Sequence, residues 1–161
     1  MNTYVRNGIA GMTIKRILSH HKTILLDSCV LIYHIEEHPR YVGLTYPILE
    51  AVTRGECQAM VSELALMEIK TGPLRYGDAH AAGDYELLLD RFPNLSLVSI
   101  SLPVLNHATR LRARYRLKTP DAIILATALG NGATLAVTND QGWKRVEGIE
   151  VLCLNDLVGG Q

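Results

Sequence analysis

Short apolar runs alternate along this chain with longer segments whose apolar residues recur at helical spacing. The first run, 24–26, predicts a buried strand that ends at Asp27. Ser28 can cap a helix that follows at once and that Pro39 ends. Later runs predict strands at 58–61, 95–100, 134–137 and 149–154. The segments between them predict helices at 46–52, from 62 to the pair Gly72-Pro73, at 84–92, at 104–116 and from Pro120 to Gly130.

Strands separated by helices predict right-handed crossovers, and therefore a central, mainly parallel sheet with helices on both faces. The expected fold class is α/β. A length of 161 residues fits one ordinary domain. We place this domain at residues 23–158. Residues 1–22 are interpreted as an N-terminal extension: either this segment is a flexible arm, or translation starts at Met12.

Composition changes this picture little. Apolar residues make up 48% of the chain and charged residues 20%, which is typical of a globular protein. The formal net charge is zero, so any binding of nucleic acid must use a local basic patch. The three cysteines are widely spaced and form no C-x-x-C pair, which favours reduced thiols. Because no apolar run is long enough for a membrane span, we expect a cytoplasmic protein without a membrane partner.

Two carboxylates fall where predicted strands end. Asp27 closes the first strand, and Asp140 follows the strand 134–137. Open parallel sheets bind ligands outside the carboxyl ends of their strands, near the point where strand order reverses. Two more acids lie on predicted helices, Glu68 beside apolar residues and Asp121 in the first turn of a helix of small and apolar residues. These four acids are the candidates for a functional site.

Four carboxylates packed without a counter-charge repel one another, which raises their pKa values or loosens the fold. A divalent cation removes that penalty, and oxygen ligands suit Mg²⁺ or Mn²⁺. Such an ion activates water and offsets charge on a phosphoryl group, so phosphodiester hydrolysis fits this set of residues. Simpler interpretations also exist. Asp27 can cap a helix, Asp121 can interact favourably with the positive end of a helix dipole, and Glu68 can lie on the surface.

Four stretches of the sequence resemble the acidic motifs of PIN domains in order, spacing and flanking residues. They are LLDSCVLI at 25–32, SELALME at 62–68 followed by TGP at 71–73, TPDAIILATA at 119–128, and VTND at 137–140. The resemblance spans about residues 24–157. The size of the chain and the Gly72-Pro73 element are most similar to VapC toxins of toxin–antitoxin pairs.

The resemblance implies a PIN-like three-layer α/β/α fold and a Mg²⁺- or Mn²⁺-dependent endoribonuclease. It also implies a cognate VapB-like antitoxin that holds the enzyme inactive, and a homodimer. Carried over to this chain, the metal-binding and catalytic acids are Asp27, Glu68, Asp121 and Asp140. Ser28 and Thr138 match positions whose hydroxyls support the site, and Asn139 lies beside it.

This chain departs from the family pattern at two places. Trp143 stands where an aromatic residue, more often phenylalanine, follows the Thr-Asn-Asp turn, and we interpret it as a packing residue. The second departure is the segment 1–22, because such toxins usually begin almost at the first strand.

Basic residues are dense just before Asp121, and an RNA backbone could bind several of them. Their even spacing spreads them around a helix, so a solvated face is the simpler interpretation for most. Arg112 and Arg116, at positions i and i+4, are the best candidates for RNA contacts. Arg75, beside Tyr76, is a further candidate for contact with substrate or partner.

Three alternatives remain open. A catalytically silent PIN-like module would bind RNA or a partner only, although all four acids are present here. A haloacid-dehalogenase-like phosphatase also has an aspartate after its first strand, but needs an Asp-x-Asp pair, and Cys29 takes the second position. A DNA-directed nuclease could use the same metal site, because 2′-hydroxyl recognition is not readable from the sequence.

Overall fold

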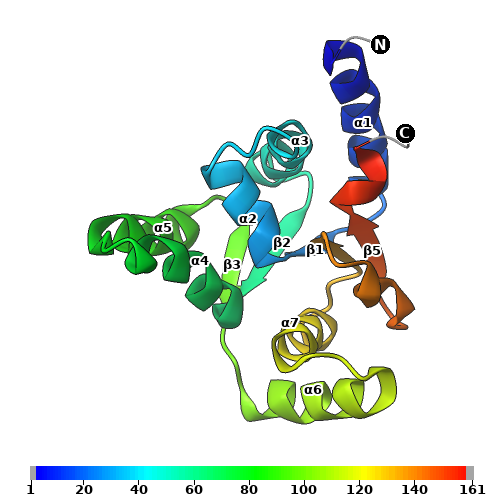
Figure 1. Ribbon diagram of the computed structural model, residues 1–161. Coiled ribbons are helices and arrows are strands. Elements are labelled where there is room, and N and C mark those ends of the chain that lie inside the picture. Colours follow the sequence, from blue (N-terminus) through cyan, green and yellow to red (C-terminus); the bar gives the residue numbers. More distant parts are fainter. Residues whose placement is uncertain (1–2, 159–161) are drawn as a thin grey trace.

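The computed structural model describes residues 3–158 (Figure 1). Its strands are β1 (Thr23–Leu26), β2 (Gln58–Ser62), β3 (Leu95–Val98), β4 (Leu135–Thr138) and β5 (Glu150–Cys153). Its α-helices are α1 (Thr3–Leu18), α2 (Ser28–Ile35), α3 (Val42–Thr53), α4 (Glu63–Arg75), α5 (Ala79–Arg91), α6 (Leu102–Tyr115) and α7 (Thr119–Gly130). Two short 3₁₀ helices complete it, η1 (Gln141–Arg145) and η2 (Leu154–Leu157).

The five strands form one sheet in the order β3-β2-β1-β4-β5, and every neighbouring pair is parallel. The chain therefore builds outward from β1 to β3 on one side, then crosses to β4 on the other side of β1. This reversal makes the carboxyl ends of β1 and β4 the topological switch point of the sheet.

Alternation along the strands explains why both faces of the sheet are covered. Ile24 and Leu26 of β1 pack into one hydrophobic core, here called the first core, which α1 to α5 complete (Figure 1). Leu25, between them, points into the second core, which is completed by α6, α7 and Trp143 of η1. The same alternation recurs in β2 and β4. The predicted three-layer α/β/α fold with a parallel sheet is confirmed.

The first turns of several helices explain where they begin. Asp27 accepts a hydrogen bond from the Ser28 backbone N–H at the start of α2, and the Ser62 hydroxyl accepts one from the Leu64 N–H in α4. Asp78 caps α5, which consequently begins earlier than the predicted residue 84.

Two sequence-based predictions differ from the structure. The pair Gly72-Pro73 does not end α4, which continues to Arg75 with Pro73 inside its last turn. Packing of α4 against α5 offsets the lost backbone hydrogen bond at the proline. Residues 3–18, expected as a flexible extension, form helix α1 against α3, with the side chains of Ile14 and Leu18 buried in the first core. None of the helices in the described part of the chain has the length and apolar character needed to cross a bilayer.

Candidate active site

The switch point places Asp27 directly beside the turn that follows β4. The Asp27 backbone N–H donates to the carbonyl of Val137 (3.0 Å), which extends the β1–β4 ladder by one residue. The buried Thr138 hydroxyl then donates to Asp27 Oδ2 (2.6 Å) and accepts from the Asp140 backbone N–H (3.1 Å). One hydroxyl therefore fixes both of the acidic residues that end neighbouring strands.

Asp27 is a half-buried carboxylate with several donors. Its Oδ1 accepts from the Ser28 backbone N–H (2.8 Å) and, more weakly, from the Ser28 hydroxyl (3.4 Å). Burial raises the pKa of Asp27, hydrogen bonds from Thr138 and Ser28 lower it, and the nearby charge of Glu68 raises it again. The helix-capping interpretation of Asp27 and the site interpretation are therefore compatible, since one oxygen caps α2 while the carboxylate faces Glu68.

Glu68 lies in the middle of α4, half-buried, on a helix that packs against α2. Its charge acts on Asp27, which places these two acids in one neighbourhood. Among the alternatives for Glu68, a fully solvated surface position does not fit this burial.

Asp121 lies in the first turn of α7, where Pro120 precedes it and Lys118 supplies no side-chain cap. Burial raises the pKa of Asp121, the indole of Trp143 lowers it, and the charge of Asp140 raises it. Asp121 and Asp140 are therefore a second pair of neighbouring acids.

Asp140 is exposed and caps η1 through a hydrogen bond from the Gly142 backbone N–H to Oδ1 (2.7 Å). A Cβ atom on Gly142 would stand only 2.9 Å from that oxygen, so a side chain there would displace the carboxylate. Glycine at position 142 thus leaves room for this orientation of the Asp140 carboxylate.

The four acids form two pairs, Asp27 with Glu68 and Asp121 with Asp140. Among the residues that the structure describes, no three acidic, histidine or cysteine side chains are grouped closely enough to hold one metal ion. The donor set still fits a hard divalent cation, because it consists of carboxylate oxygens, and because the charge of Glu68 raises the pKa of Asp27 and that of Asp140 raises the pKa of Asp121. A cation between the pairs would offset both repulsions.

Asn139 precedes Asp140 and forms hydrogen bonds with two other elements. Its Oδ1 accepts from the Asn155 backbone N–H in η2 (2.8 Å), and its Nδ2 donates to the Tyr33 hydroxyl in α2 (3.4 Å). Both ends of the amide are therefore engaged with other elements. Asn139 links the turn after β4 to α2 and to the end of the sheet.

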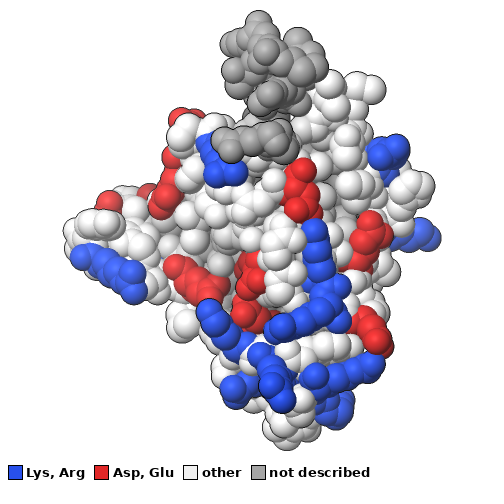
Figure 2. Space-filling model, turned by 45° about the vertical axis from the view of Figure 1, so that its right-hand side comes forward, with Lys and Arg blue, Asp and Glu red and all other residues white. Residues whose placement is uncertain are grey.

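Basic side chains gather over the lower part of the molecule, where α6 lies, next to a group of acidic side chains (Figure 2). Arg112 Nε donates to the Leu117 carbonyl (3.1 Å), which ties α6 to the turn before α7. Arg116 ends α6 in the left-handed region (φ 52°) and is exposed. Arg75, the third predicted RNA contact, is exposed at the end of α4.

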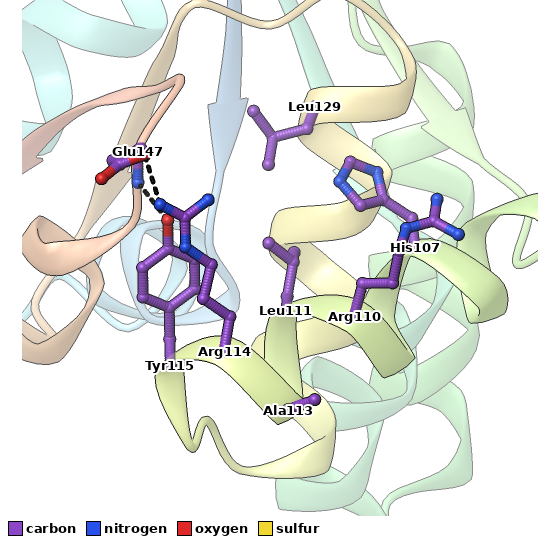
Figure 3. Close-up of a pocket in the computed structure, with 8 residues that line it drawn as sticks. All are labelled: His107, Arg110, Leu111, Ala113, Arg114, Tyr115, Leu129 and Glu147. Carbon is purple, nitrogen blue, oxygen red and sulfur yellow. Dashed lines mark hydrogen bonds and ion pairs between the residues drawn. The ribbon is translucent and has the colours of Figure 1, made fainter.

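A cavity of about 780 Å³ lies between α6, the end of α7 and the turn that carries Glu147, and none of the four acids lines it (Figure 3). His107, Arg110 and Arg114 line it from one stripe of α6, and Leu129 of α7 contributes to its wall. Arg114 pairs with Glu147 (2.7 Å), and its guanidinium lies 5.1 Å from the centre of the Tyr115 ring.

Sequence reasoning did not anticipate the contact of Trp143 with the site. Trp143 was interpreted as a packing residue, and it is indeed buried in the second core. Its polar atom nevertheless acts on Asp121. The only signal in the sequence was the exchange of the family's usual phenylalanine for a residue with an N–H group.

Comparison with known proteins adds to this geometry. Residues 24–149 match the model of the PIN domain. This chain belongs to the PIN-domain family. The PIN domain matches a chain of a toxin–antitoxin complex from Klebsiella pneumoniae with 25% identity and a TM-score of 0.64, over 81% of this chain and 97% of that chain. The predicted resemblance to PIN domains is thereby confirmed.

Two further structures share the fold of this PIN domain at lower identity. VapBC2 from Rickettsia felis, bound to a DNA fragment from its promoter, has 20% identity and a TM-score of 0.62, over 81% of this chain and 98% of that chain. DNA-bound VapBC from Salmonella typhimurium has 19% identity and a TM-score of 0.61, over 82% and 98%. No curated protein sequence matches the chain.

Proposed function

We propose that this PIN-domain protein is a metal-dependent endoribonuclease and the toxin of a type II toxin–antitoxin pair. The observation that carries the proposal is that Asp27 and Asp140 lie at the switch point of a PIN fold, and that the charge of Glu68 acts on Asp27 and that of Asp140 on Asp121. The four acids would hold Mg²⁺ or Mn²⁺. When bound, the ion would activate water and offset charge on the phosphate being cleaved.

The residues around the acids have supporting roles in this proposal. Thr138 and Ser28 hold the Asp27 carboxylate by hydrogen bonds, so that its orientation is fixed before any ligand arrives. Asn139 braces the turn that carries Asp140. Arg112, Arg116 and Arg75 are the proposed contacts to the RNA backbone, because they present positive charge to a substrate with one negative charge per nucleotide.

Cleavage of structured RNA tests the enzymatic part. Wild-type protein should cut RNA with Mg²⁺ or Mn²⁺ and not in excess chelator, and Asp27→Asn and Asp121→Asn should each abolish cutting. Asp90→Asn, at an exposed acid of α5, is the matched control and should cut normally. Cleavage that survives both site substitutions would exclude the proposed site. A DNA strand of the same sequence distinguishes a DNA-directed enzyme.

The catalytically silent module is the alternative, and the lack of a group of three metal ligands in the described residues is the observation that favours it. It predicts RNA binding that is equal in wild type and Asp27→Asn, with no cleavage at any metal concentration. The same experiment therefore decides between the two functions.

The partner proposal rests on the toxin–antitoxin complexes among the similar structures. Large apolar side chains exposed on α4 and α6, such as Met67, Leu74 and Leu102, are available for a protein contact, either with a VapB-like antitoxin or within a homodimer. Expression in the cytoplasm should arrest growth, and Asp27→Asn should relieve the arrest. Co-expression with the neighbouring gene product should also relieve it, and sedimentation of the purified protein measures the oligomer.

A further inference from the structure

The indole nitrogen of Trp143 is a buried donor without an acceptor. The side chain is 1% exposed, and Nε1 has no hydrogen-bond partner among the described residues. Buried side-chain donors are nearly always paired, so an unpaired one needs an explanation. A phenylalanine would keep an aromatic ring at this position without an N–H group.

Trp143 contacts both of the elements that carry the second acidic pair, Asp121 and Asp140. Asp140 caps η1, the helix that carries Trp143, and the Trp143 backbone N–H donates to the Asp140 carbonyl (3.3 Å). The ring packs in the second core together with Ala122 and Leu125 of α7, the helix that carries Asp121. The indole N–H lowers the pKa of the Asp121 carboxyl, although the two groups do not meet in a hydrogen bond.

Rotation of the Asp121 carboxylate can bring one of its oxygens within hydrogen-bonding distance of the Trp143 indole N–H. The last torsion of an aspartate side chain is broad, so the Asp121 carboxylate can turn without moving α7. A divalent cation that engages one oxygen of Asp121 leaves the other oxygen free to accept a hydrogen bond. Residues that hold metal-binding carboxylates in this way commonly set both their orientation and their affinity.

We infer that Trp143 is a positioning residue, whose indole N–H donates to the Asp121 carboxylate when a divalent cation binds and holds that carboxylate in its ligating orientation. The inference rests on the proposed function, because it needs Asp121 to be a metal ligand. It assigns to Trp143 a polar role in addition to packing.

The chain contains a single tryptophan, so its indole N–H gives one signal in a ¹H–¹⁵N spectrum of the full-length protein. Titration with Mg²⁺ should move that signal downfield and slow its exchange with solvent, with the same saturation curve that calorimetry gives for Mg²⁺ binding. The shift should disappear in Asp121→Asn. Mg²⁺ binding that leaves the indole signal unchanged would overturn the inference and leave the proposed function intact.

Trp143→Phe removes the N–H group and keeps an aromatic ring. We expect it to weaken Mn²⁺ binding by roughly 10- to 100-fold. Val146→Ala is the matched control, because Val146 is buried in the same core and has no polar side-chain atom. It should lower stability and leave Mn²⁺ affinity unchanged. Equal losses of affinity in both variants would indicate packing alone, and a wild type that binds neither ion would overturn the proposed function and this inference together.

Discussion

The Thr138 hydroxyl bridges the two acidic residues that end neighbouring strands, since it donates to Asp27 Oδ2 at 2.6 Å and accepts from the Asp140 backbone N–H at 3.1 Å. The hydroxyl is fully buried, so neither bond can be replaced by bulk water. One oxygen atom therefore couples the Asp27 carboxylate to the backbone of Asp140, in addition to the pairing of β1 with β4.

Thr138→Val should remove both hydrogen bonds while the shape of the side chain is kept. We expect the free energy of unfolding to fall by about 1–3 kcal/mol, because the Asp140 backbone N–H and Asp27 Oδ2, both in part-buried hydrogen bonds, lose their partner. Mn²⁺ affinity should fall as well, since Asp27 is no longer held. Thr127→Val is the control: Thr127 is equally buried, but its hydroxyl bonds only to the Ile123 carbonyl in its own helix. An unchanged Mn²⁺ affinity in Thr138→Val would contradict the bridging role.

The raised pKa values of Asp27 and Asp121 predict a pH dependence of the metal-free protein. Each carboxyl binds its proton more tightly in the folded state than in the unfolded state, whose ordinary value is 3.8, mainly because of burial. The folded state therefore holds more protons just above that pH, and the free energy of unfolding falls as pH rises from 3.8 through the raised values. Above them, the contribution no longer changes.

Urea denaturation in chelator across this pH range measures the effect. Asp27→Asn cannot ionise at residue 27, so the decrease should be smaller in this variant than in wild type. Addition of Mg²⁺ should also reduce the decrease at higher pH, because the ion binds the ionised carboxylates. A wild-type profile that rises across the window would show that the two carboxyls are stabilised as anions.

Arg116→Gln should weaken RNA binding through the loss of one phosphate contact. The slope of log affinity against log salt concentration should decrease in magnitude by about 0.7 for each contact removed from a single strand. Arg112→Gln should behave in the same way, with an added loss of stability because Arg112 also bonds to the Leu117 carbonyl. Arg54→Gln, at the residue that follows α3, removes the same charge elsewhere and should leave the slope unchanged. Anisotropy of labelled RNA at several salt concentrations measures all three.

Helix α1 should contribute to stability through its buried face. Ile14→Ala should lower the free energy of unfolding by about 2–5 kcal/mol, because Ile14 is 0% exposed in the first core. Ile9→Ala on the same helix removes a side chain that is 55% exposed, and should change stability by less than about 0.5 kcal/mol. Equal effects would mean that α1 does not dock in solution. A protein that begins at Met12 would still contain Ile14 and Leu18.

The sheet was predictable because its signals are local. Apolar runs located all five strands within a few residues, and the acids after β1 and β4 were expected at the switch point from connectivity alone. Helix α1 was not predicted, since Gly8 and Gly11 weaken its helical propensity and its stability comes from distant residues of α3.

The pairing of the acids could not be read from the sequence. Motif order predicts four carboxylates in one region, but the division into Asp27 with Glu68 and Asp121 with Asp140 depends on how α4 and η1 pack. The same holds for Trp143, whose aromatic character suggested packing and whose N–H is defined only by its neighbours in space. Helix α4 exceeded its predicted end for a similar reason, because contacts with α5 outweigh the local effect of Pro73.

Each acidic pair belongs to a different layer of the molecule. Asp27 and Glu68 are carried by elements of the first core, and Asp121 and Asp140 by elements of the second. An ion bound by all four acids would link the two helical layers at the carboxyl ends of the strands. Binding of the ion would then slow proteolysis in both helical layers at the same time, although the cleavage sites do not touch the ion.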